Sequence, residues 1–370
     1  MKKLLSMLLS AVLIFTMISA AGQSVFAGNS IEAVNFNSAD GAYVNTIEVA
    51  GGSTSSVDIK MPQKGIMVLF FVNGIPADCS VSVKDSKGAD RGTVRLEKSS
   101  EEMNLPVYYD KAGTYTYTFS GESAGSFSLE YQAGYAPVKG TLKNNKVFYG
   151  SSPEGYAYYK INIPGNGYIT VNTESMIYGD TAAGVQLTSA DKKSYFKDYE
   201  LFTDGEAIKM GVSKGTYYLK VSLSNPYDVY SLKYSFKSVK AMAGSSKSKA
   251  QTIKKGAVKK GIISASQKSS KADWYRFTIN KTQNVDISVY TDTNMGGNTD
   301  GGIKISFYQK GKSYAFGKSV LNNEQPEKVL FPYSNPSTKK LAPGTYYIKV
   351  QKTGNCNGYY RLKWEKYIQI

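Results

Sequence analysis

The chain of 370 residues contains no histidine and only two cysteines, Cys79 and Cys356. Without histidine, Ser-His-Asp and Cys-His catalysis and nearly every zinc-hydrolase site are excluded. The two cysteines lie in different repeats, so a disulfide framework is absent and burial must stabilise the fold. Cys79 shares its alternation phase with Val81 and Val83, which predicts a small core residue, whereas Cys356 lies in a turn and is expected to be a free thiol.

Other catalytic motifs are also scarce. The single G-x-S-x-G string, at residues 121–125, falls between two expected strands and predicts a solvated hairpin turn. A carboxylate pair for glycoside hydrolysis is left open, because any two of the 29 acidic residues could meet in space. We nevertheless expect a protein that is not an enzyme.

The segment 1–27 has the pattern of a signal peptide. Two lysines precede an apolar stretch to about Ala21, and small residues near Ala27 suit a leader peptidase. An uncleaved membrane anchor is the alternative, although serine and threonine interrupt the apolar stretch. No later segment reads as a membrane span. The predicted location is therefore secreted, either extracellular or loosely associated with the cell wall.

Thirty tyrosines and 35 glycines, with few helical periodicities, indicate an all-β fold. The string Gly-Thr-Tyr opens an alternating segment at residues 113, 215 and 344, and three further strand landmarks recur in the same order around it. The third copy is longer, with its extra residues expected near 291–302 and 321–340. Alternation with Gly- and Asn-rich turns predicts antiparallel, jelly-roll-like β-sandwiches.

These repeats predict three tandem sandwich domains after the signal peptide, at residues 28–133, 134–244 and 245–370. The first boundary is weakly marked at residues 132–134. The second is marked by small and polar residues at 243–249, which we expect to form a flexible linker.

The third copy carries the strings Ala272-Asp273-Trp274-Tyr275-Arg276-Phe277 and Pro343-Gly344-Thr345-Tyr346-Tyr347. With these motifs it resembles the bacterial pre-peptidase C-terminal (PPC) domain, which is similar to the collagen-binding modules of secreted collagenases. The resemblance implies jelly-roll-like sandwiches attached to exported enzymes, especially peptidases, some of which bind calcium or matrix polymers. Within these 370 residues we expect no catalytic domain beside the repeats. The second copy has Ala157 where the third has Asp273, which leaves a role for that carboxylate in doubt there.

Calcium is the one candidate cofactor. The loop at 291–301 gathers oxygen-bearing side chains among glycines, the ligands that calcium prefers: Asp292, Asn294, Asn298 and Asp300. The loop lacks the spacing of an EF-hand, and a plain polar turn is the alternative.

Charge is distributed unevenly along the chain. Residues 28–133 contain 8 basic and 13 acidic residues, a net charge of −5. Residues 134–244 contain 13 and 9, a net charge of +4, and residues 245–370 contain 22 and 7, a net charge of +15. Such a basic region favours an anionic polysaccharide or cell-wall polymer as partner, ahead of nucleic acid. A lysine-rich solubilising surface is the alternative.

In the third copy, side chains along each expected strand point alternately to an inward and an outward face of the sheet. The inward set is Tyr275, Phe277, Ile279, Tyr346, Ile348, Val350, Tyr360, Leu362 and Trp364. The outward set, predicted to bind polymer by stacking and charge, is Trp274, Arg276, Tyr347, Lys349, Tyr359, Arg361 and Lys363. We expect the strands at 346–350 and 359–364 to pair as a hairpin, which would join these residues into one face. The alternative is that tyrosine is simply a good strand residue, since the second copy has outward Tyr158 and Tyr218.

Together these features predict a secreted, non-catalytic carbohydrate-binding protein at the cell surface, whose third module docks onto an anionic polymer. The alternative hypothesis is an accessory protein-interaction partner of an exported peptidase or other hydrolase.

Overall fold

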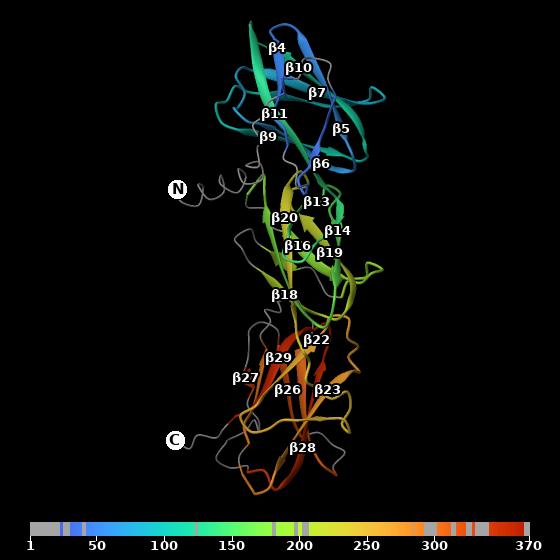
Figure 1. Cartoon of the computed structure of the whole chain (residues 1–370), viewed down its shortest axis with the longest axis vertical. Coiled ribbons are helices and arrows are strands. Elements are labelled where there is room, and N and C mark those ends of the chain that lie inside the picture. The colour runs from blue at the N-terminus through green and yellow to red at the C-terminus, as the bar shows by residue number, and fades with distance from the viewer. Residues whose placement is uncertain are drawn as a thin grey trace.

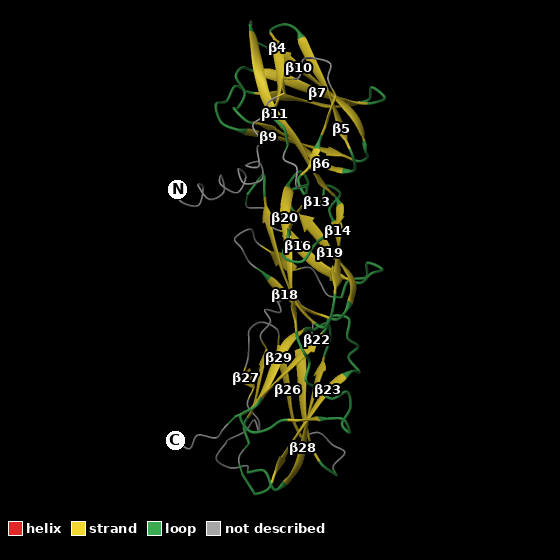
Figure 2. Ribbon diagram, viewed as in Figure 1, coloured by secondary structure: helices red, strands yellow, loops and turns green. Residues whose placement is uncertain are grey.

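The computed structural model describes residues 23–24, 30–38, 42–122, 125–179, 183–195, 199–201, 207–283, 285–291, 302–311, 316–322, 328–329 and 340–365. Every regular element in these ranges is a β-strand (Figure 2), which confirms the all-β prediction. Within the same ranges, no helix has the length and hydropathy needed to cross a membrane.

The first eleven strands form one pair of sheets. They are β1 (Gln23–Ser24), β2 (Ser30–Glu32), β3 (Val34–Asn35), β4 (Asn45–Ala50), β5 (Thr54–Met61), β6 (Gly65–Phe71), β7 (Cys79–Asp85), β8 (Asp90–Leu96), β9 (Met103–Tyr109), β10 (Gly113–Gly121) and β11 (Ser126–Pro137). One sheet has the order β1-β4-β11-β6-β9 with β3 beside β11, and the other has the order β2-β5-β10-β7-β8.

The next nine strands form a second pair. They are β12 (Lys139–Thr141), β13 (Val147–Ser151), β14 (Ala157–Ile163), β15 (Gly167–Ser175), β16 (Ala183–Thr188), β17 (Tyr199–Leu201), β18 (Ile208–Val212), β19 (Gly215–Leu223) and β20 (Val229–Ser238). The two sheets have the orders β12-β14-β19-β16-β17 and β13-β20-β15-β18.

The last nine strands form a third pair. They are β21 (Gln251–Thr252), β22 (Val258–Ile263), β23 (Ala272–Ile279), β24 (Ile287–Thr291), β25 (Gly302–Gln309), β26 (Phe316–Asn322), β27 (Lys328–Val329), β28 (Gly344–Lys352) and β29 (Gly358–Trp364). Their orders are β21-β23-β28-β25-β26 and β22-β29-β24-β27.

The three pairs, called modules one, two and three below, share one strand order, to which module one adds β1 and β3. The Gly-Thr-Tyr strand has the same place in each: β10 lies between β5 and β7, β19 between β14 and β16, and β28 between β23 and β25. Pairing is antiparallel except at short edge strands such as β2, β12 and β21, which run parallel to their neighbours. The division into separately folding domains stays a prediction. β11 itself continues to Pro137, past the boundary expected after residue 133.

Each module encloses its own cluster of buried apolar side chains. All nine residues of the predicted inward set are buried, as alternation on a two-layer sandwich requires. Cys79 is buried in the first core, as predicted, and burial raises the pKa of its thiol to about 11. Cys356 follows β28 in a turn, but the turn folds inward and this cysteine is fully buried in the third core.

The modules follow one another along the long axis of the molecule (Figure 1) and touch through buried contacts. Between modules one and two, the Ser151 hydroxyl donates to the backbone oxygen of Ala136 at 2.8 Å. Between modules two and three, the amide of Gly211 donates to Oδ1 of Asn357 at 2.7 Å. The expected flexible linker at 243–249 is instead hydrogen-bonded, because the backbone groups of Gly244 pair reciprocally with those of Trp274 at 2.9 Å.

Candidate functional site

Four residues of the predicted binding set meet on the outer face of module three. Trp274 and Arg276 lie on β23, directly opposite Lys349 and Tyr347 of β28. Arg276 is exposed, while the other three are half-buried, so all four reach the surface. We call Trp274, Arg276, Tyr347 and Lys349 the module-three patch. Each strand contributes one ring and one cation, and each ring faces a cation across the strands.

The rest of the predicted set lies elsewhere, and the expected hairpin is wrong. β28 pairs with β23 and β25, whereas β29 pairs with β22 and β24 in the opposite sheet. The chain crosses from one sheet to the other between β28 and β29, so strands adjacent in sequence are not hydrogen-bonded neighbours. Tyr359, Arg361 and Lys363 therefore cannot share a face with the module-three patch.

These three residues have local partners of their own. Tyr359 is only 8 % exposed and packs against Tyr168 of module two, with ring centres 6.1 Å apart. The guanidinium of Arg361 lies 5.5 Å from the ring centre of Tyr290. Lys363 forms an ion pair with Glu365 at 2.6 Å. These contacts favour a structural role over polymer binding.

Two residues missed by the sequence reasoning extend the module-three patch. Tyr308 of β25 lies directly opposite Tyr347, and its ring centre is 5.5 Å from that of Trp274. The ammonium of Lys247 lies 5.3 Å from the Tyr308 ring and 5.0 Å from the Tyr347 ring. Tyr308 could have been found from the alternation of β25, but Lys247 belongs to the segment assigned as a linker, and only the folded turn brings it here.

Electrostatics in this region are strongly positive. The pKa of Lys349 is lowered, first by burial and then by the positive charge of Lys304. Its ammonium lies 5.5 Å from the ring centre of Trp274, a cation–π arrangement. Within the described residues, Arg276 and Lys349 have no acidic partner in an ion pair. An anionic ligand would therefore not have to displace a carboxylate from either residue.

Module two repeats this arrangement at the same positions of the same strands. Tyr158 and Lys160 of β14 lie directly opposite Lys220 and Tyr218 of β19. The rings of Tyr158 and Tyr218 meet edge to face with centres 6.3 Å apart. We call Tyr158, Lys160, Tyr218 and Lys220 the module-two patch.

Module one has the equivalent strands but lacks the aromatic and cationic side chains. The matching positions are Ser56 and Asp58 of β5, opposite Thr118 and Thr116 of β10. These short polar side chains bond one another, Ser56 to Thr118 at 2.9 Å and Thr116 to Asp58 at 2.6 Å. The patch is therefore not a requirement of the fold, because a module with the same strand order is built without it.

The predicted calcium ligands, Asp292, Asn294, Asn298 and Asp300, lie outside the described residues. In the described part of the chain, no three His, Cys, Asp or Glu side chains come together as a metal site would require.

Asp273 points inward and contributes to neither patch. Its carboxylate accepts a hydrogen bond of 2.5 Å from Tyr360, whose hydroxyl lies 2.9 Å from that of Tyr275. Burial raises the pKa of Asp273, while the bond from Tyr360 opposes that rise. Asp273 is thus the partly buried member of a polar chain whose other members, Tyr275 and Tyr360, are fully buried.

No family model matches this chain, and no curated protein matches it. Among solved structures, the PBSX exported protein XepA is 8 % identical over 51 % of this chain and 84 % of its own, with a TM-score of 0.19. A triple jelly-roll turret protein of an archaeal virus is 8 % identical over 85 % and 82 %, with a TM-score of 0.17. A GH2 β-galacturonidase from Eisenbergiella tayi is 13 % identical over 53 % and 37 %, also with a TM-score of 0.17. These likenesses are too slight to assign a family or a function.

Proposed function

We propose that the protein is a secreted, non-catalytic binding protein that docks onto an anionic polysaccharide of the cell wall or the extracellular matrix. The observation that carries this proposal is the module-three patch, a row of aromatic rings and cations on the most basic part of the chain. The resemblance of this module to the PPC domain, whose relatives include polymer-binding modules, supports the same function.

The side chains of the module-three patch suit an acidic sugar. The faces of Trp274, Tyr308 and Tyr347 offer flat apolar surfaces for the C–H face of a sugar ring. Arg276, which lies directly opposite Tyr347, and Lys349, whose ammonium lies 5.5 Å from the Trp274 ring centre, can pair with carboxylate or sulfate groups. Arg276 can do so in a bidentate manner. Stacking would position each sugar, and charge would select polymers that carry anions.

An open sheet face favours a polymer over a small molecule. Same-face residues along a strand are separated by about 6.6 Å, so the patch presents repeated contacts across neighbouring strands. The net charge of +15 in residues 245–370 would further raise the local concentration of polyanion around this face.

The test is retention of the chain from Gly28 to Ile370 on immobilised polygalacturonate and heparin across a salt series. The double variant Trp274→Ala/Lys349→Ala should elute at clearly lower salt than the unaltered protein. The matched control is Ser56→Ala/Thr118→Ala, which changes a directly opposed pair on the equivalent strands of module one and should elute unchanged. Retention that does not respond to salt, or to the module-three variant, would contradict the proposal.

The secreted location has a separate test. Expression of the full sequence in a bacterial host should yield a culture-supernatant protein whose N-terminus is Gly28 by mass spectrometry. A cell-bound protein that keeps the segment 1–27 would contradict export with cleavage. Recovery of one stoichiometric protein partner, with no binding to either polysaccharide, would favour the accessory-partner hypothesis instead.

A further inference from the structure

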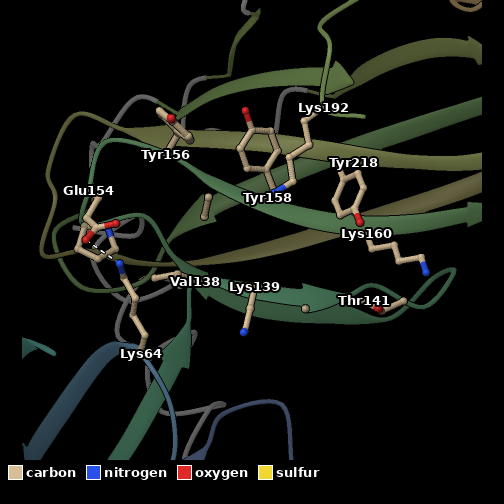
Figure 3. A pocket seen from close by; sticks show the side chains of 13 residues that line it. Lys64, Val138, Lys139, Thr141, Glu154, Tyr156, Tyr158, Lys160, Lys192 and Tyr218 are labelled. Atoms are coloured by element: carbon tan, nitrogen blue, oxygen red, sulfur yellow. Dashed lines mark ion pairs between the residues drawn. The ribbon is translucent and has the colours of Figure 1, made fainter. Parts of the chain in front are cut away.

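A groove lies beside the module-two patch. It has a cavity volume of about 460 Å³ and lies where β12, the turn before β14 and the outer face of β14 and β19 come together (Figure 3). Three tyrosines, Tyr156, Tyr158 and Tyr218, and three lysines, Lys139, Lys160 and Lys192, line it. We call this the Tyr158 groove.

The three tyrosine rings of the groove contact one another in succession. Tyr156 and Tyr158 meet edge to face with centres 5.5 Å apart, and Tyr158 meets Tyr218 in the same way at 6.3 Å. The ammonium of Lys192 lies 4.6 Å from the Tyr158 ring centre and 5.7 Å from that of Tyr218. That of Lys220 lies 4.7 Å from Tyr156. The tyrosines are therefore held at defined angles instead of lying loosely on the surface.

The charge of the groove is positive. Its one acidic lining residue, Glu154, is neutralised by Lys64 of module one, at 2.6 Å, and accepts a bond of 2.7 Å from the Tyr108 hydroxyl. These hydrogen bonds, from Lys64 first, lower the pKa of Glu154, so it remains ionised and paired. Within the described residues, Lys139, Lys160 and Lys192 have no ion-pair partner.

We propose that the Tyr158 groove is a second binding site, which takes one or two anionic sugar units of the polymer held by the module-three patch. This inference rests on the proposed function, and three observations carry it. The same four-position pattern occurs in modules two and three and is absent from module one. The groove adds a third ring, Tyr156, and a cavity volume of about 460 Å³. Its three lysines are free of ion pairs with any described residue, so an anionic sugar can pair with them.

Two sites on one chain have a predictable consequence. Once one site holds a polymer, the second site binds a segment that is already nearby, which raises overall affinity by roughly 10²- to 10⁴-fold when the geometry allows both contacts. Loss of either patch should thus weaken binding of a long polymer much more than binding of a short oligosaccharide.

The test is isothermal titration of the chain from Gly28 to Ile370 with tetragalacturonate at low salt, read together with tryptophan emission. The chain has only two tryptophans, Trp274 in the module-three patch and the buried Trp364, so module two itself is silent in this emission. We expect two sites per chain, and one site for the variant Tyr158→Ala/Tyr218→Ala, with its Trp274 response unchanged. Lys192→Asn, a milder variant, should weaken the second site several-fold; Asn tolerates the left-handed φ of 62° at this position.

The two proposals fail in different ways. One site per chain, with a full Trp274 response and no effect of either module-two variant, would overturn the Tyr158 groove while the proposed function stands. A different result would overturn the role of module three instead: titration finds one site, the module-two variants remove that site, and Trp274 emission does not change. Tighter binding of a single-stranded oligonucleotide than of tetragalacturonate would overturn the sugar assignment of the groove.

Discussion

Trp274 of β23 stands directly opposite Lys349 of β28, and the lysine ammonium lies 5.5 Å from the centre of the indole ring. The next opposed pair on this face, Arg276 and Tyr347, reverses the order of ring and cation. This alternation gives Trp274 and Tyr347 each a cationic neighbour both along the strand and across to the opposed strand. A ligand with a flat apolar face and anionic substituents complements such a surface, and a neutral apolar ligand does not.

Reversal of one exposed charge should weaken docking without affecting the fold. Arg276 is exposed, and its Nε donates only one side-chain hydrogen bond in the described structure, to Thr252 at 3.2 Å. Arg276→Glu should lower affinity for polygalacturonate about 10-fold or more at low salt, with a smaller difference at high salt because ions screen exposed charges. Titration at two salt concentrations measures this.

The matched control is Lys84→Glu, which makes the same change of charge at an exposed position of module one. If both variants lose affinity equally, net charge and not the module-three patch controls binding. That outcome would support the solubilising-surface alternative with unspecific attraction.

Asp273 should make stability depend on pH in the direction opposite to that of a typical carboxylate. Because burial raises the folded-state pKa above the unfolded value of about 3.9, the contribution of Asp273 to stability is greatest below the unfolded pKa and is lost as pH rises through the folded-state pKa. Asp273→Asn removes the charge, while its amide oxygen can still accept from Tyr360. Thermal unfolding should show a higher Tm for the variant at pH 7 and no difference near pH 3.

A lower Tm for Asp273→Asn at pH 7 would mean that the charged bond from Tyr360 outweighs the cost of burial. Ala157, which occupies the matching position of module two and is buried without a carboxylate, favours the first outcome.

The junction between modules two and three should tolerate no added side chain at Gly211. A Cβ atom there would lie 2.3 Å from the backbone oxygen of Ile263 and 2.8 Å from the amide of Gly358, and backbone cannot rotate away as a side chain can. Gly211→Ala should therefore destabilise the protein by about 1–3 kcal/mol. Chemical denaturation measures this loss.

Gly165→Ala is the control for this substitution, because nothing lies within 4 Å of a Cβ atom at that position. Equal stability of the Gly211→Ala protein and the control would show that the close contact of modules two and three is absent in solution.

The face of the sheet on which a side chain lies depends on alternation within a strand, and the sequence predicted it for the following residues. Trp274, Arg276, Tyr347 and Lys349 were placed on one outward face because residues two apart on a strand point the same way. The buried set from Tyr275 to Trp364 followed from the same rule. Cys79 was placed correctly in the core for this reason too.

The pairing of strands depends on how the chain crosses from one strand to the next, and it could not be predicted. Strand β29 follows β28 after a short turn, yet it joins the opposite sheet, so Tyr359 becomes a buried contact of module two. Alternation fixes the face of a residue but not the partner of its strand. Likewise, Lys247 reaches two rings only because its segment folds back onto β23, and the Tyr158 groove requires Lys64 from another module.

The central claim is that Trp274 contacts an anionic sugar, and its emission tests this most directly. In a Trp364→Phe background, titration with tetragalacturonate should shift or quench the remaining emission in a saturable manner, and 1 M salt, at which the Debye length is about 3 Å, should abolish most of the change. Binding that is detected by calorimetry but leaves Trp274 emission unchanged would contradict the account.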